Sequence, residues 1–148
     1  MPTRKRSGTR SAANSIAGPP EPLVFFLDES LDSITVAAAL RDAGATIERA
    51  TELFPRGTPD EVWLTEAGRS RWVVLTRDQR IRYRQLEVLA LREARVRAFV
   101  FTGGNVTVKD TASILVGALK RLVRIARADP GPFIYHLGRA GKPVKMRS

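Results

Sequence analysis

This chain has 148 residues, 43% of them hydrophobic, which suffices for a single core and leaves little room for a second full domain. It contains no cysteine, which excludes disulfides, zinc–thiolate sites and thiol nucleophiles, and no apolar run approaches the about 20 residues of a membrane span. We therefore expect a cytoplasmic protein without a membrane partner, and its formal net charge of +10 favours polyanionic or acidic partners.

Both ends of the chain are basic. Residues 1–22 are rich in Arg, Ser, Gly and Pro and have almost no large apolar side chains, so we expect a disordered tail. This tail carries a net charge of +3, and residues 129–148 carry another +3. Such ends either keep a protein soluble or grip phosphates, and the sequence leaves both interpretations open. Within the C-terminal end, two short segments around Gly138 to Gly141 predict a hairpin appended to the sheet.

The folded body, residues 23–128, alternates between short apolar runs and segments of helical periodicity. Residues 23–27 are too few for a helix and typical of a strand buried on both faces, which we place at the centre of the sheet. Further strands are predicted over residues 46–48, 72–75 and 96–101, and helices over 31–43, 58–67, 83–94 and 108–126. This alternation predicts an α/β fold, a three-layer sandwich with a four-stranded, mainly parallel sheet between helices.

Local signals define the ends of two of these helices. Gly44 stands where a left-handed C-cap would end the first helix. The segment Thr58-Pro59-Asp60-Glu61 predicts a helix start, with Glu61 bonding back to Thr58 in a capping box. Asp60 would then be free to face a site, and Gly68 is the expected end of this helix.

Acidic residues gather where an open parallel sheet binds its ligands, beyond the carboxyl ends of the strands. Asp28 follows the first strand, Asp78 follows the third, and Asp60 opens the helix between them. Each acid alone is explained as a helix-start residue, but three converging carboxylates repel one another unless a cation or a shared proton compensates. Because there is no cysteine and the one histidine, His136, is interpreted as structural, the set favours Mg²⁺ or Mn²⁺.

Several neighbours of these acids are candidates for supporting roles. Glu29 is either a helix-start residue or a residue that supports a ligand, and Glu61 is a further candidate for that supporting role. The Thr76 hydroxyl could contact a ligand, a water molecule or a phosphate. Four arginines, Arg77, Arg80, Arg82 and Arg84, crowd the start of the third helix. They form either a solvated basic face or the rim of a groove that holds RNA phosphates. We interpret the glycine pair at 103–104 as a turn, because no phosphate-binding fingerprint surrounds it.

Taken in order, Phe26-Leu27-Asp28-Glu29, Gly44, Asp60-Glu61 and Val74-Leu75-Thr76-Arg77-Asp78 resemble the minimal PIN-like domains, the superfamily that includes VapC-type toxins. The resemblance runs from Val24 to about Asn105. It implies a metal-dependent nuclease that hydrolyses RNA phosphodiesters, with Asp28, Asp60 and Asp78 as catalytic metal ligands. An ion would activate a water molecule, and no covalent intermediate is required.

The sequence also departs from the pattern of this family. Many relatives place a further acid two residues beyond the position of Asp78, where this chain has Arg80. Larger PIN domains place one after the next strand, where Asn105 could act only as a neutral substitute. An alternative interpretation is therefore a non-catalytic PIN-like module with a degenerate metal site, which binds RNA or a protein.

The family resemblance further implies the toxin of a type II toxin–antitoxin system, whose cognate antitoxin would cover the basic face. The RNA target, the number of metal ions and the oligomeric state, including a homodimer, stay open at this stage.

Overall fold

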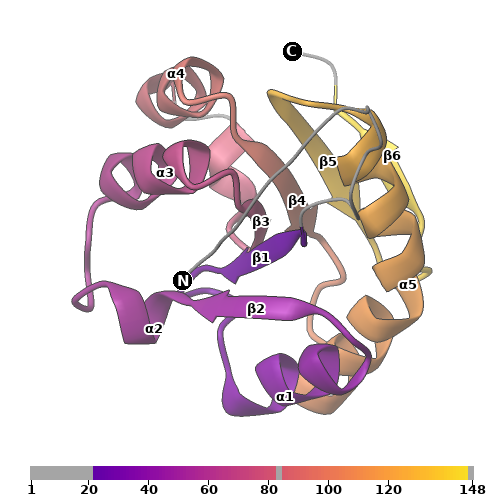
Figure 1. Cartoon of the computed structure of the whole chain (residues 1–148). Helices are drawn as coiled ribbons and strands as arrows, with labels where there is room; N and C mark the ends of the chain where they lie inside the picture. Colours follow the sequence, from indigo (N-terminus) through magenta and orange to yellow (C-terminus); the bar gives the residue numbers. More distant parts are fainter. Residues whose placement is uncertain (1–21, 83–84, 147–148) are drawn as a thin grey trace, which may run out of the picture.

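The computed structural model describes residues 22–82 and 85–146, so all but the last residue of the predicted N-terminal tail lies outside the described part of the chain. A six-stranded sheet stands between two layers of helices (Figure 1). The strands are β1 (Val24–Leu27), β2 (Thr46–Arg49), β3 (Val73–Thr76), β4 (Arg97–Phe101), β5 (Phe133–Leu137) and β6 (Pro143–Lys145). The helices are α1 (Ile34–Asp42), α2 (Ala50–Leu53), α3 (Asp60–Arg69), α4 (Gln85–Glu93) and α5 (Val108–Ala128), with a 3-10 helix at Gln79–Arg82.

The strand order is β2-β1-β3-β4-β5-β6, and every pair is parallel except β5 with β6. The predicted α/β fold with a mostly parallel sheet is confirmed, but the sheet has six strands where four were expected. The predicted C-terminal hairpin forms, and its first strand continues the sheet because α5 returns the chain parallel to β4. Consequently β1 is an inner strand, whereas β3 and β4 occupy the middle.

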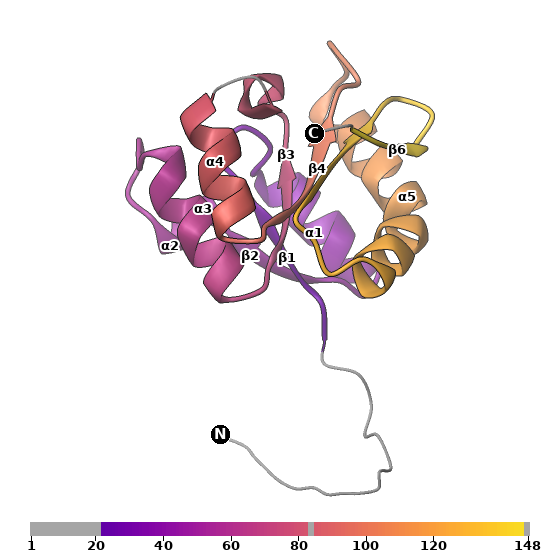
Figure 2. The same ribbon diagram turned by 90° about the horizontal axis from the view of Figure 1, so that it is seen from above.

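Each face of the sheet has its own core. Phe25 faces a cluster built with α1 and α5, whereas its neighbour Phe26 faces a cluster built with α3 and α4. This follows from the alternation of side chains along a strand. In Figure 2 the two helical layers lie on opposite sides of the strands. The predicted three-layer sandwich is confirmed. The helices among the described residues include none with the length and apolar character of a membrane span.

The ends of α1 follow ordinary capping chemistry. Ser33 precedes the helix, and its hydroxyl accepts a hydrogen bond from the Val36 amide at 3.0 Å. Gly44 follows the helix with φ +100°, as predicted for a left-handed C-cap position. The chain therefore turns sharply after α1 and enters β2.

The ends of α3 differ from the prediction. No side chain caps its first turn, and the Thr58 hydroxyl donates to the Pro55 carbonyl at 2.5 Å, so the capping box with Glu61 is not formed. The helix also continues through Gly68 to Arg69. A Cβ at Gly68 would lie 2.2 Å from the Ala94 carbonyl oxygen, so this glycine serves the close packing of α3 on the end of α4.

Candidate functional site

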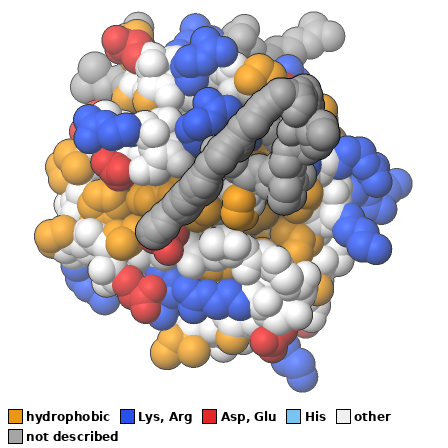
Figure 3. All heavy atoms as spheres, in the orientation of Figure 1, with side chains coloured by type: hydrophobic (Ala, Val, Ile, Leu, Met, Phe, Trp, Pro, Cys, Tyr) orange, Lys and Arg blue, Asp and Glu red, His pale blue; other side chains and the backbone are white. Residues whose placement is uncertain are grey.

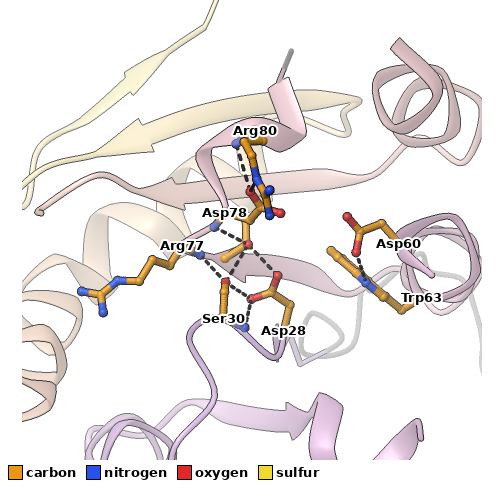
Figure 4. Close-up of polar contacts among 8 residues, drawn as sticks. Asp28, Ser30, Asp60, Trp63, Arg77, Asp78 and Arg80 are labelled. Carbon is orange, nitrogen blue, oxygen red and sulfur yellow. Dashed lines mark hydrogen bonds and ion pairs between the residues drawn. The ribbon is translucent and has the colours of Figure 1, made fainter. Parts of the chain in front are cut away.

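Asp28 lies at the carboxyl edge of the sheet, directly after β1, and only 6% of it is exposed. Its carboxylate is held entirely by neutral donors (Figure 4). Oδ1 accepts from the Ser30 amide at 3.1 Å and from the Ser30 hydroxyl at 2.6 Å, and Oδ2 accepts from the Thr76 hydroxyl at 2.6 Å. The carboxylate is thereby fixed in position, and no cation among the described residues neutralises it.

Ser30 and Thr76 join the loop after β1 to the loop after β3. Their hydroxyl oxygens lie 3.2 Å apart. The Ser30 hydroxyl accepts from the Arg77 amide at 2.9 Å, and the Thr76 hydroxyl accepts from the Asp78 amide at 3.0 Å. Thr76 thus bonds to Asp28 directly, and its supporting role at a metal site stays a prediction.

Ser30 was not among the residues predicted from the sequence. The signal that could have identified Ser30 is the Asx turn, in which the side chain of an aspartate at a strand end accepts a hydrogen bond from the backbone amide two residues later. The contact of its hydroxyl with Thr76, 46 positions away, requires the pairing of β1 with β3 and is invisible in the sequence.

Asp60 is the first residue of α3 and approaches the same edge from the other layer (Figure 4). Its Oδ1 accepts from the indole Nε1 of Trp63 at 3.0 Å, one turn further along the helix. The buried Trp63 packs against Phe26, so the ring that orients Asp60 is itself fixed in the core. The carboxylate of Asp60 is thus oriented by a core residue, and its role as a metal ligand stays a prediction.

Asp78 follows β3 and differs from the other two acids in having a cationic partner. Its Oδ1 accepts from the backbone amide of Arg80 at 3.0 Å and from the Arg80 Nε at 3.1 Å. Arg80 stands at the position where the family resemblance led us to expect a further acid. This ion pair partly compensates the charge of Asp78 without a metal ion.

The environment of this edge raises the pKa of the Asp28 carboxyl. Burial raises the pKa of this carboxyl to about 6, against the hydrogen bonds from Ser30 and Thr76, which lower it. The negative charges of Asp60 and Asp78 raise the pKa further. The carboxylates of Asp60 and Asp78 therefore act on Asp28, and a bound cation would favour its ionised form.

The residues present fit a hard divalent cation by their chemistry. Carboxylate and hydroxyl oxygens lie at the edge, and the pKa of Asp28 is raised by burial and then by the charges of Asp60 and Asp78, so a nearby cation would favour its ionised form. Among the described residues no group of three acids or histidines is assembled at metal-binding distance. Asp60 and Asp78 are instead held by Trp63 and Arg80, so a shared metal site stays a prediction.

The predicted supporting residues are dispersed. The Glu29 carboxylate accepts from the Gly57 amide at 3.1 Å and so fastens the loop that leads into α3. Glu61 lies on the outer face of α3, where it lines a shallow surface depression with Phe54 and Val62. Asn105 is exposed in the turn before α5, and no hydrogen bond joins it to the carboxylates.

Of the four predicted arginines, the structure describes the side chains of Arg77 and Arg80, and these two contact different partners. Arg77 extends away from Asp28 and Asp60 (Figure 4), and its guanidinium lies 5.2 Å from the centre of the Phe101 ring. Arg80 pairs with Asp78. Arg84 and the side chain of Arg82 fall outside the part of the chain that the structure describes.

Comparisons with known proteins identify the family of this chain. Residues 23–103 match the sequence profile of a family described as a PIN like domain, which is more than half of the chain. The chain is also similar to a protein of Mycobacterium tuberculosis described as "Putative ribonuclease VapC45", with 28% identity over 115 residues, 75% of this chain and 83% of that protein. No solved structure matches the chain. The matched profile spans Asp28, Asp60 and Asp78, and it ends before α5 and the last two strands.

Proposed function

We propose that this chain, which belongs to the PIN-like domain family, is a metal-dependent endoribonuclease that hydrolyses RNA phosphodiester bonds. The environment of Asp28 carries the proposal, because burial and then the charges of Asp60 and Asp78 raise the pKa of this carboxyl at the ligand-binding edge of the sheet. Such a group is costly in the ionised form unless a cation compensates it. The description of the mycobacterial relative as a ribonuclease supports RNA as the substrate and hence the cytoplasm as the compartment.

Asp28, Asp60 and Asp78 are the residues that would hold Mg²⁺ or Mn²⁺. When bound, the ion supplies an activated water and stabilises negative charge on the leaving oxygen. Ser30 and Thr76 hold the Asp28 carboxylate in place, and Trp63 orients Asp60 through its indole N–H. These contacts are made before substrate arrives, which is the preorganisation that such a reaction needs.

Asp78→Asn tests this proposal. Cleavage of single-stranded RNA by the whole chain should require Mn²⁺ or Mg²⁺, stop on chelation, and fall at least about 100-fold in the variant, because one charged oxygen ligand is lost. The matched control is Asp42→Asn, which removes the same charge from an exposed position at the far end of α1. Calorimetric titration with Mn²⁺ should give weaker binding for Asp78→Asn only. Undiminished cleavage in Asp78→Asn would overturn the site.

The ion pair of Arg80 with Asp78 favours a second candidate, a non-catalytic PIN-like module that binds RNA or a protein. In that case the cation of Arg80 takes the place of a metal-binding acid, and the site is degenerate. The same Mn²⁺ titration separates the two candidates. A chain that binds RNA but neither binds Mn²⁺ nor cleaves RNA is the module and not the nuclease.

The resemblance to VapC-type toxins supports a finer proposal, that the protein is the toxin of a type II toxin–antitoxin system. A cognate antitoxin would then be acidic where it meets exposed cations such as Lys120, Arg121 and Arg124 on α5, the helix over which basic side chains gather at the right of Figure 3. Expression of the unmodified chain in bacteria should arrest growth, and Asp78→Asn should not. Equal growth with both proteins would contradict a toxin role.

A further inference from the structure

Two arginines from distant parts of the chain meet at the turn between β4 and α5. The Arg77 Nη2 lies 3.5 Å from the Gly104 carbonyl oxygen and donates to the Thr111 hydroxyl at 3.2 Å. Arg139, which follows β5, donates from its Nε to the Gly103 carbonyl at 2.6 Å. The two guanidinium groups therefore flank one short turn, although their residues are 62 positions apart in the sequence (139 − 77).

The positive charges at this turn are not compensated by the described residues. Neither Arg77 nor Arg139 forms an ion pair with a carboxylate in the described part of the chain. The contacts that they do make are to carbonyl and hydroxyl oxygens and, for Arg77, to the Phe101 ring. Arg139 is exposed, and only its Nε is engaged among the described residues, which leaves the two terminal nitrogens of its fork available.

The turn itself presents backbone close to these cations. A Cβ at Gly103 would lie 2.2 Å from the Phe101 ring, and Gly104 has φ +74°, so both positions require glycine for structural reasons. Gly104 and Asn105 are exposed. The prediction of a turn at this glycine pair is thus correct, and its surface is bordered by two guanidinium groups.

This basic turn lies on the same edge of the sheet as the three acids. Parallel strands end at one edge, and Arg77 and Arg139 follow β3 and β5 there, as Asp28 and Asp78 follow β1 and β3. The link to Asp28 is short, because the Arg77 amide donates to the same Ser30 hydroxyl that donates to the Asp28 carboxylate. A single-stranded RNA bound at the three acids can therefore continue along this edge of the sheet to the basic turn.

We infer that Arg77, Arg139 and the exposed part of the Gly103–Asn105 turn form a phosphate-binding subsite for RNA. The inference rests on the proposed ribonuclease function, and it adds the course of the substrate, from the acids over β1 and β3 towards β4 and β5. A phosphate a few nucleotides from the scissile bond lies between the two guanidinium groups, whose forks match its oxygens. Arg139 is then a phosphate-binding residue in the loop after β5. Both β5 and this loop lie beyond the part of the chain that matches the family profile.

Arg139→Gln tests the subsite without any cleavage. Binding of a fluorescein-labelled single-stranded RNA of twelve nucleotides is measured in EDTA between 50 and 300 mM NaCl. The variant should bind about three- to tenfold more weakly at low salt, and its slope of log affinity against log salt should fall by about 0.7, the share of one phosphate contact. Arg139→Lys keeps the charge and should retain most of that slope.

Arg95→Gln is the matched control, since the Arg95 Nη2 also donates to a turn carbonyl, that of Gly131, but on the amino side of β4. It should bind RNA like the unmodified chain. RNAs that carry one neutral methylphosphonate at a time should identify one position at which the replacement weakens the unmodified chain but not Arg139→Gln.

Equal weakening by Arg139→Gln and Arg95→Gln, or the absence of such a position, would overturn the subsite and leave only non-specific charge attraction. The nuclease proposal fails separately: if RNA binding depends on Arg139 but Asp78→Asn and the unmodified chain are equally inactive with Mn²⁺, the subsite stands without catalysis.

Discussion

The carboxyl edge of the sheet has two halves of opposite charge. The acidic half consists of Asp28, Asp60 and Asp78 over β1, β3 and α3, and the basic half consists of Arg77 and Arg139 at the turn between β4 and α5. In both halves most of the charged groups are held by neutral partners. Hydroxyl and indole groups donate to Asp28 and Asp60, and carbonyl and hydroxyl oxygens accept from the two arginines.

The comparison indicates that the two halves do not compensate each other. Arg77 follows β3 like Asp78, but its side chain turns away from the acids and contacts Phe101 and Thr111. Among the side chains that the structure describes, only Arg80 crosses this division, by pairing with Asp78. A cation on the acidic half and a phosphate on the basic half would satisfy both sets of charges, which is the combination that a metal ion and an RNA strand supply.

Among changes to the two halves, we expect the largest effect from Asp28→Asn, measured as the free energy of unfolding without metal. The folded-state pKa of Asp28, about 6, is above its ordinary value of 3.8, so between these values the folded state binds more protons than the unfolded state. The contribution of Asp28 to the free energy of unfolding therefore falls as the pH rises through this window. Above the window, keeping this buried carboxyl ionised destabilises the folded state by on the order of 3 kcal/mol. Asn accepts from Ser30, can donate to Thr76 and avoids that cost.

Urea unfolding in EDTA at a series of pH values from 4 to 8 measures this effect. Asp28→Asn should exceed the unmodified chain in free energy of unfolding above pH 6, and the difference should shrink towards pH 4. Asp42→Asn, at its exposed position, should match the unmodified chain throughout. A pH-independent difference for Asp28→Asn would mean that the acidic half is not electrostatically strained.

A smaller effect is expected from Ser30→Ala, which removes the hydroxyl that bridges the two halves. Without it the Asp28 carboxylate loses one donor and the Arg77 amide loses its acceptor. Single-turnover cleavage at saturating Mn²⁺ should slow about tenfold, a loss of about 1.4 kcal/mol, while the affinity for RNA is retained. Ser70→Ala removes a hydroxyl bond of equal length, 2.6 Å to Glu66, far from this edge, and should leave the rate unchanged. Slowing in both variants would refute a positioning role for Ser30.

Much of the fold could be predicted because its signals are local. Short apolar runs identified β1, β3 and β4, helical repeats identified α1, α3, α4 and α5, and Gly44 marked the end of α1, whereas the short helix α2 was not predicted. The position of β5 beside β4 could not be predicted, because it depends on how α5 packs across the sheet and on pairing between residues more than 30 positions apart. That is why four strands were expected and six are found.

The contrast between local signals and distant contacts also separates the site residues that were predicted from those that were not. Asp28, Asp60 and Asp78 were identifiable because each stands next to the end of its own element. The convergence of Arg77 and Arg139 depends on β5 and was not predicted, and the proposed capping box failed because Thr58 bonds to Pro55 instead. The sequence is thus informative where function follows from the position in one element, and silent where two distant loops must meet.

The smallest effect is expected from Arg80→Gln, which removes the cation that pairs with Asp78 in the acidic half. The Arg80 side chain is 69% exposed and its ion pair with Asp78 is 3.1 Å long, so the pair competes only weakly with a bound ion. Mn²⁺ affinity measured by calorimetry should rise about two- to fivefold at low ionic strength and less at high salt, where the exposed pair is screened. Arg80→Glu places a second carboxylate beside Asp78 and should raise the affinity further. Arg92→Gln, with the same change in net charge on the exposed face of α4, is the control. If Arg92→Gln raises the affinity as much as Arg80→Gln, the effect belongs to net charge; if neither does, Asp78 is not a ligand that Arg80 restrains. In both cases the separation of the edge into an acidic and a basic half would lose its functional meaning at this residue.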